Sequence, residues 1–215
     1  MEKQHLQDIG DKIRATFDAK DDAREQAFAL SREVIRNSAN AIRAIHREEY
    51  EEALDLMDKT AKALAQIDKV LAEHLDVYWA GFVHDAQKEY AEARATYALI
   101  HRDPLPHPDD VGVSYAAYLN GLGEAVGELR RHILDEMRSR GPGWGEEMLS
   151  AMDDVYYLLA SMDYPNAISG NLKRTTDVTR SIIEKTRGDL TAATRAQHLE
   201  KAMTRLEERL KSESD

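Results

Sequence analysis

The stretch 48-EEYEEALDLMDKTAKALAQIDKVLAEHL-75 decides the fold class, because its apolar residues recur at helical spacing. Three or four residues separate each apolar position from the next, and charged residues fill most of the positions between them. This pattern predicts an amphipathic helix that buries one face. The apolar positions are Leu54, Met57, Ala61, Leu64, Ile67, Leu71 and Leu75.

The same periodicity extends along the chain on both sides of this stretch. Further helices are predicted over residues 21–46, 77–100, 111–138, 145–162 and 167–187, followed by a polar helical tail from residue 191. The breaks between them are the proline-rich loop 101–110 and the tetrad Gly141-Pro142-Gly143-Trp144, and Gly188 is expected to close the helix before the tail. No segment has the pattern of a strand, so the sequence predicts an all-α protein.

Length and composition restrict the class of protein further. The 215 residues favour one domain over 1–215, with 1–20 and 191–215 peripheral to it. The chain has no cysteine, which excludes disulfides, thiolate zinc sites and cysteine nucleophiles. No stretch approaches the roughly 18 consecutive apolar residues of a membrane span, so we expect a cytoplasmic protein without a membrane partner.

The charge of the chain determines how it could meet nucleic acid. A formal net charge of -11 argues against general adhesion to phosphate, so any nucleic-acid contact needs a local basic surface. Four arginines lie within a sector of roughly 60° on one predicted helix. They could bind phosphates, or they could pair with acidic residues of a neighbouring helix. These residues are Arg32, Arg36, Arg43 and Arg47.

A pair of glutamates marks the predicted helix 77–100. Glu89 and Glu92 stand three residues apart, which places both carboxylates on one face, and Asp85 lies one turn earlier. Carboxylates on one face can share Mg²⁺, which favours oxygen ligands and keeps waters that can attack phosphate. A solvated helix face with no metal has the same spacing, and both interpretations stay open at this point.

A second polar row follows Tyr118. Glu124, Glu128 and His132 repeat every four residues. A di-iron bundle needs a Glu-x-x-His motif on each of two helices, and that pair is missing here. The sequence also contains no Walker loop, dinucleotide glycine fingerprint or serine elbow.

Several short motifs, in order, resemble the translin family. Glu89-Tyr90-Ala91-Glu92-Ala93 resembles the Glu-Tyr-x-Glu-Ala motif of translin-associated factor X. Tyr118-Leu119-Asn120-Gly121 and Gly127-Glu128-Leu129 resemble the signatures Tyr-Leu-x-Gly and x-Glu-Leu. The stretch 163-DYPNAISGNLKRTTDVTRSIIEKTRGDL-190 is similar to the C-terminal helices of the family. The resemblance covers roughly residues 21–190, and the retained glutamate pair places the chain nearer factor X than translin.

The resemblance implies a seven-helix bundle that assembles into a closed homo-oligomeric shell, with an octamer as one candidate. For the factor X branch it implies an endoribonuclease that needs Mg²⁺, with Mn²⁺ as an alternative, and acts on single-stranded RNA inside the shell. It gives Glu89 and Glu92 the catalytic and metal-binding role. Translin itself implies the alternative, a non-catalytic scaffold that binds single-stranded RNA or DNA.

A third acidic position follows from the same resemblance. Aligning Val155-Tyr156 with the equivalent pair of the family makes Glu147 a further catalytic and metal-binding residue. A family aspartate would then fall at Gly143, which has no carboxylate, and Glu146 or Glu128 could take its place. The sequence therefore predicts a metal centre at Glu89, Glu92 and Glu147, with the arginine row holding RNA phosphates.

Overall fold

The computed structural model describes residues 2–212, and within them helices are the only regular secondary structure. This confirms the predicted all-α fold. The elements are α1 (Glu2–His46), α2 (Tyr50–Val70), α3 (Leu75–Tyr78), α4 (Phe82–His101), α5 (Pro108–Val111), α6 (Tyr115–Arg140), the 3-10 helix η1 (Pro142–Trp144), α7 (Gly145–Ala160), α8 (Asn166–Ser169) and α9 (Leu172–Ser212).

The chain divides into two compact units. The first contains the described residues up to Arg94 together with Pro106–Gly121, and the second contains Ala95–Leu105 and the described residues from Leu122 onward. The long helices α4 and α6 each run unbroken through both units. The expectation of a single domain over 1–215 stays a prediction.

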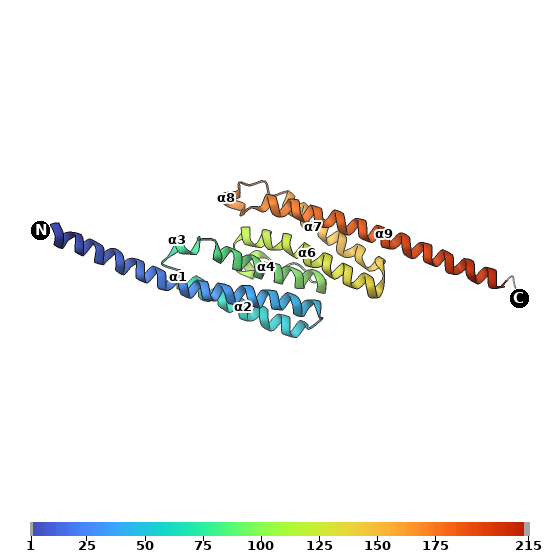
Figure 1. The fold of residues 1–215 in the computed structure, drawn as a ribbon, viewed down its shortest axis with the longest axis horizontal. Coiled ribbons are helices and arrows are strands. Elements are labelled where there is room, and N and C mark those ends of the chain that lie inside the picture. Colours follow the sequence, from blue (N-terminus) through green and yellow to red (C-terminus); the bar gives the residue numbers. More distant parts are fainter. Residues whose placement is uncertain (1, 213–215) are drawn as a thin grey trace. The chain divides into compact units, whose positions relative to one another are not determined.

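The first unit is built on a hairpin of α1 and α2, which Figure 1 shows lying side by side along the second half of α1. The helices reverse direction at Glu48, whose φ of 61° lies in the left-handed region. Alanines dominate the buried face of α1, so α2 can approach closely and insert larger side chains. The buried apolar residues of this hairpin include Ala27, Val34, Ala41 and Ile45 on α1, and Met57, Leu64 and Ile67 on α2.

The end of α2 differs from the sequence prediction. The helix stops at Val70 instead of continuing to Leu75, and the short α3 follows. The next long helix begins at Phe82, after Gly81 adopts a φ of +102° that other residues rarely adopt. Leu71 and Val77 are both buried although they lie on either side of the turn. The apolar pattern therefore continues past the end of α2 and does not mark where the helix stops.

Gln87 connects the first turns of α4 to the segment that precedes α6. Its side chain is buried, and Nε2 donates a hydrogen bond to the hydroxyl of Tyr78 at 3.0 Å. Its Oε1 accepts from the backbone N–H of Ser114 at 3.2 Å. The Tyr118 hydroxyl donates to the carbonyl oxygen of Pro106 at 2.6 Å. These bonds satisfy buried polar groups and fix where α6 starts relative to α4.

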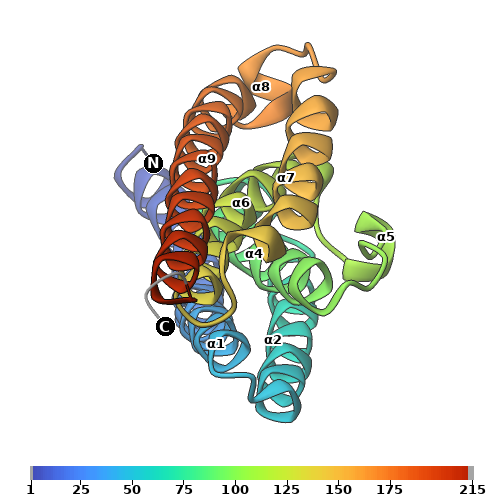
Figure 2. The same cartoon turned by 90° about the vertical axis from the view of Figure 1, so that its right-hand side faces the viewer.

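In the second unit, α7 and α9 pack against each other, as Figure 2 shows. A Cβ at Gly145 would lie 2.7 Å from Leu190 Cδ2, so a larger residue there would force the Leu190 side chain to move. Asp153 on α7 accepts two hydrogen bonds of 2.8 Å from Arg187 on α9. Before α7, the predicted break is confirmed, because Gly141 has a φ of +85° and η1 follows it.

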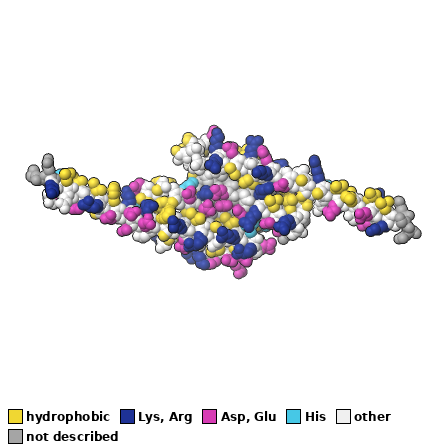
Figure 3. Space-filling model, viewed as in Figure 1, with side chains coloured by type: hydrophobic (Ala, Val, Ile, Leu, Met, Phe, Trp, Pro, Cys, Tyr) yellow, Lys and Arg dark blue, Asp and Glu magenta, His cyan; other side chains and the backbone are white. Residues whose placement is uncertain are grey.

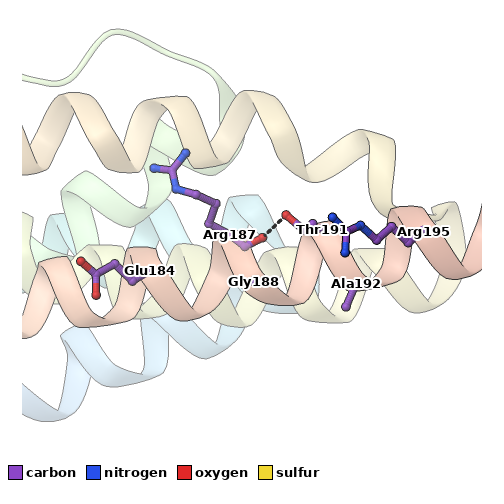
Figure 4. A pocket seen from close by; sticks show the side chains of 6 residues that line it. All are labelled: Glu184, Arg187, Gly188, Thr191, Ala192 and Arg195. Atoms are coloured by element: carbon purple, nitrogen blue, oxygen red, sulfur yellow. Dashed lines mark hydrogen bonds between the residues drawn. The ribbon is translucent and has the colours of Figure 1, made fainter.

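The prediction that Gly188 closes a helix is wrong. The helix α9 continues without interruption from Leu172 to Ser212. Gly188 has helical backbone geometry and leaves a shallow hollow on the helix surface, which Figure 4 shows. The Thr191 hydroxyl bonds to the Arg187 carbonyl at 2.7 Å across it, and buried Leu190 anchors the next turn to the unit. Packing therefore outweighs the cost of one glycine inside a helix, about 1 kcal/mol.

Candidate metal centre and nucleic-acid interface

Glu89 and Glu92 lie on one face of α4, as their spacing predicts, and both side chains are half-buried. Tyr90, Ala91 and Ala93 beside them are buried, so this part of α4 is surrounded by protein. Partial burial of carboxylates is costly unless hydrogen bonds, cations or protons compensate for lost water. The pair is therefore not an ordinary solvated helix surface.

The position of this face is set by a close contact between α4 and α6. A Cβ at Gly121 would lie 2.7 Å from the carbonyl oxygen of Lys88 and 2.8 Å from the backbone nitrogen of Glu92. Real Cβ atoms do not approach backbone atoms this closely, so glycine is required for the two helices to meet here. Gly121 belongs to the Tyr-Leu-x-Gly signature found in the sequence.

The contact at Gly121 brings a third carboxylate to the pair. Glu124 follows Gly121 by three residues on the same unbroken helix, so it faces the same direction one turn later. One carboxylate oxygen each from Glu89, Glu92 and Glu124 lies within 4.8 Å of the other two. Glu124 is half-buried like the others. Sequence reasoning placed Glu124 in a separate polar row and missed its proximity to the pair.

Positive charge near the three carboxylates comes in part from Lys88. Its Nζ lies 3.2 Å from Glu89 Oε1, and its side chain is 19% exposed. One turn earlier, burial lowers the pKa of His84 below its ordinary value; the charge of Asp85 opposes this shift and that of Lys88 adds to it. The lowered pKa favours the neutral form of His84, so this residue is not the source of compensating charge.

The donor set suits a hard divalent cation. Three carboxylates offer oxygen ligands only, which is the preference of Mg²⁺ and the closely related Mn²⁺. Their mutual repulsion at this separation is relieved when a cation binds. The residues present therefore fit the metal that the family resemblance implies.

Glu147 lies in a different setting from the three carboxylates. It is exposed near the start of α7, and its Oε2 forms an ion pair of 2.8 Å with Arg102 Nη2. Gly143 lies in η1, where a Cβ would meet nothing within 4 Å. The role of Glu147 in metal binding and catalysis stays a prediction.

The remaining members of the second polar row are engaged elsewhere in the second unit. Glu128 Oε2 lies 3.7 Å from Arg131 Nη1. His132 is buried, with its ring centroid 5.2 Å from that of Trp144 in an edge-to-face arrangement. These contacts give Glu128 and His132 a structural explanation.

The arginine row lies on the exposed face of α1 and the turn that follows it. Arg32 places its guanidinium 4.6 Å from the centroid of the Phe28 ring, and Arg43 donates to Asn40 Oδ1 at 2.7 Å. Arg47 pairs with Glu49 and Glu52, and the hydrogen bond to Glu49 raises the pKa of Arg47. Within the described part of the chain, no ion pair involves Arg32, Arg36 or Arg43. Three of the four predicted arginines thus keep their charge available to a ligand.

Comparison with known proteins identifies the family. No family model matches the sequence. An uncharacterized protein of Methanocaldococcus jannaschii, MJ0175, is 31% identical over 172 residues, which are 80% of this chain and 76% of that protein. The structure of AfC3PO in complex with duplex RNA is 30% identical with a TM-score of 0.75, covering 91% of this chain and 98% of that one. The chain belongs to the translin/C3PO family.

Other solved C3PO structures agree with this assignment. AfC3PO without RNA is 29% identical, with a TM-score of 0.73 over the same shares of both chains. Apo-NeC3PO is 20% identical with a TM-score of 0.77, over 85% of this chain and 96% of that one, and shows the fold alone. The predicted membership of the translin family is confirmed. Among the described residues of this C3PO-like chain, no helix has both the length and the apolarity to cross a bilayer.

Proposed function

We propose that this translin/C3PO-family chain is a metal-dependent endoribonuclease of the factor X type, which works as a homo-oligomeric shell. The observation that carries the proposal is the convergence of Glu89, Glu92 and Glu124 within 4.8 Å. Translin-type binders need the fold and an RNA surface but no such cluster. Three half-buried carboxylates in one place are costly to the fold, and a metal-binding role accounts for them.

RNA binding is supported by two observations. The structural neighbour AfC3PO has been determined in complex with duplex RNA. In this chain, Arg32, Arg36 and Arg43 present guanidinium groups on one exposed helix face without acidic partners among the described residues. Guanidinium groups bind phosphate oxygens through paired hydrogen bonds, and a local basic face overcomes the net charge of -11.

The three glutamates share one task in the proposed reaction, which is to hold the metal. Glu89 and Glu92 on α4 and Glu124 on α6 would hold the metal, and the close approach at Gly121 would set the spacing of the ligands. Bound there, Mg²⁺ or Mn²⁺ supplies an acidified water and offsets the negative charge that develops on the phosphate. The side chain of Lys88 neutralises part of the carboxylate charge and keeps the centre from repelling the RNA backbone.

Single-stranded RNA is the proposed substrate, as the factor X resemblance implies. Because the AfC3PO complex contains duplex RNA, the two forms of RNA must be compared directly. The alternative function is a non-catalytic shell that binds single-stranded RNA or DNA. It predicts binding by the arginine row with no cleavage under any metal condition.

The test is cleavage of a labelled RNA in single-stranded and duplex form, with Mg²⁺, with Mn²⁺ and with chelator. We expect metal-dependent cleavage of the single strand by the parent protein. The variant Glu89→Gln with Glu92→Gln should bind RNA but lose cleavage by about a hundredfold or more. A control variant, Glu51→Gln with Asp58→Asn, removes two exposed acids from α2 and should cleave normally. Cleavage by the glutamine variant at the parental rate would leave the binding shell as the better function.

A further inference from the structure

The C-terminal part of α9 carries a row of exposed apolar side chains. Leu199, Met203, Leu206 and Leu210 are 56–63% exposed, and Figure 3 shows hydrophobic side chains along this end of the helix. Single exposed leucines are common, but four in line along about 17 Å of helix are not. The row therefore indicates a covered surface in the working protein.

This row is not a continuation of the face by which α9 packs on its own unit. The buried residues of α9 fall on one side of the helix, and the last of them is Leu190. At 100° per residue, that side continues as Thr194, Gln197, Lys201 and Glu208, all polar. The exposed apolar row lies about 160–220° away, on the opposite side. Packing among the described residues thus gives no reason for it.

The row has the spacing of a two-stranded coiled coil. Leu199, Met203, Leu206 and Leu210 are separated by four, three and four residues, which makes them alternating d and a positions of a heptad. One heptad earlier, the same positions are Ala192 and Ala196. The hollow beside Gly188, lined in part by Ala192 and Arg195, lies at the start of this row (Figure 4). Small residues at this end allow two helices to approach closely.

The flanking charges indicate the partner and its direction. In this heptad Arg195 and Arg209 occupy g positions, and Glu200 and Glu207 occupy e positions. In a parallel pair of identical helices, Arg195 of one copy faces Glu200 of the other, five residues on, and the contact occurs twice. In an antiparallel pair, glutamates face glutamates and arginines face arginines, which is unfavourable.

We propose that residues 192–210 of α9 form a parallel, in-register coiled coil with the same segment of a second copy of this chain. The inference does not depend on the nuclease proposal, because it uses none of the residues of the carboxylate cluster or the arginine row. It names one surface through which the proposed homo-oligomer is built.

The absence of cysteine from the chain allows a direct test by disulfide trapping. The two copies of an a-position residue face each other only in a parallel, in-register pair, at a distance that a disulfide can span. Under mild oxidation of the full-length protein, Met203→Cys should form a covalent dimer that reductant dissolves. The control, Lys201→Cys, lies on the opposite side of the helix and should stay monomeric on a non-reducing gel.

The contact between Arg195 and Glu200 of the two copies can be tested in the same assay. Adding Arg195→Glu to Met203→Cys should lower the rate of dimer trapping about two- to fivefold, because glutamate then faces glutamate. Adding Glu200→Arg as well should restore the rate. Restoration would support the g-to-e' contact, and failure of the double exchange to recover would contradict it.

Three results would overturn the proposal. One is trapping of Met203→Cys no faster than of Lys201→Cys. Another is faster trapping when the separate Met203→Cys and Leu206→Cys proteins are mixed than in either protein alone, because an a position faces a d position only in antiparallel helices. The third is trapping only when Met203→Cys is mixed with Leu6→Cys, because the partner would then be the apolar row Leu6, Ile9, Ile13 and Phe17 at the start of α1. RNA cleavage measured on the same samples separates this outcome from the nuclease proposal.

Discussion

The carboxylate cluster and the arginine row are two charged regions that sequence periodicity singles out in the same way, but they differ in burial and in how close their side chains lie. The carboxylates of Glu89, Glu92 and Glu124 are half-buried and drawn together by the contact at Gly121. The arginines are exposed and lie along α1 with local partners, such as Asn40 for Arg43. Here, side chains on one helix face form a compact cluster where a second helix contributes a residue to them, and they stay separate where it does not.

The difference also predicts how each region responds to mutation. Side chains that are held close by backbone contact act as one unit, so losing one should disable the whole. Side chains that act separately on a flexible ligand should contribute in small, nearly additive steps.

The largest effect is expected from the third carboxylate. Glu124→Gln should lower RNA cleavage by about a hundredfold, because it removes one of three oxygen ligands without changing size. Glu147→Gln is the matched comparison, since Glu147 is exposed and paired with Arg102. If Glu147→Gln abolishes cleavage while Glu124→Gln does not, the third ligand is Glu147, as the family resemblance implies, and not Glu124.

The next effect concerns the contact that builds the cluster. Gly121→Ala should destabilise the protein by about 1–3 kcal/mol, because the added Cβ meets two backbone atoms of α4 below 3 Å. Gly127→Ala on the same helix is the control. Its Cβ would approach nothing closer than Ile182 Cδ1 at 4.0 Å, so it should stabilise by about 0.5–1 kcal/mol. Urea unfolding of both variants measures the difference, and equal effects would contradict the close approach.

The smallest effect is expected from the arginine row. Arg36→Ala with Arg43→Ala should weaken binding of single-stranded RNA and reduce the slope of log K against log salt by about 1.4, for two lost phosphate contacts. The control, Arg14→Ala with Arg24→Ala, removes the same charge from α1 at residues that already pair with acids. Binding titrations at several salt concentrations distinguish them. An unchanged slope would assign the row to a structural role.

The helices and the residues that share each helix face can be predicted from the sequence. The spacing of Glu89 and Glu92 correctly places both on one face, and Gly141 correctly marks a break. Glu124 was missed because its relation to α4 depends on Gly121, a residue whose importance lies in the side chain it lacks. Gly188 was misjudged for the converse reason, since the burial of Leu190 holds a helix together across it.

Thermal unfolding with and without Mg²⁺ measures whether the carboxylate cluster binds a divalent cation. Binding at one hundred times the Kd stabilises a protein by about 2.7 kcal/mol, which raises the Tm of a chain of this size by about 5–10 °C. We expect this rise in the parent and in the Glu51→Gln, Asp58→Asn control. The Glu89→Gln, Glu92→Gln variant should match or exceed the Tm of the metal-free parent, because the repulsion is relieved, and should not respond to Mg²⁺. An equal response to Mg²⁺ in the glutamine variant and the parent would contradict the claim.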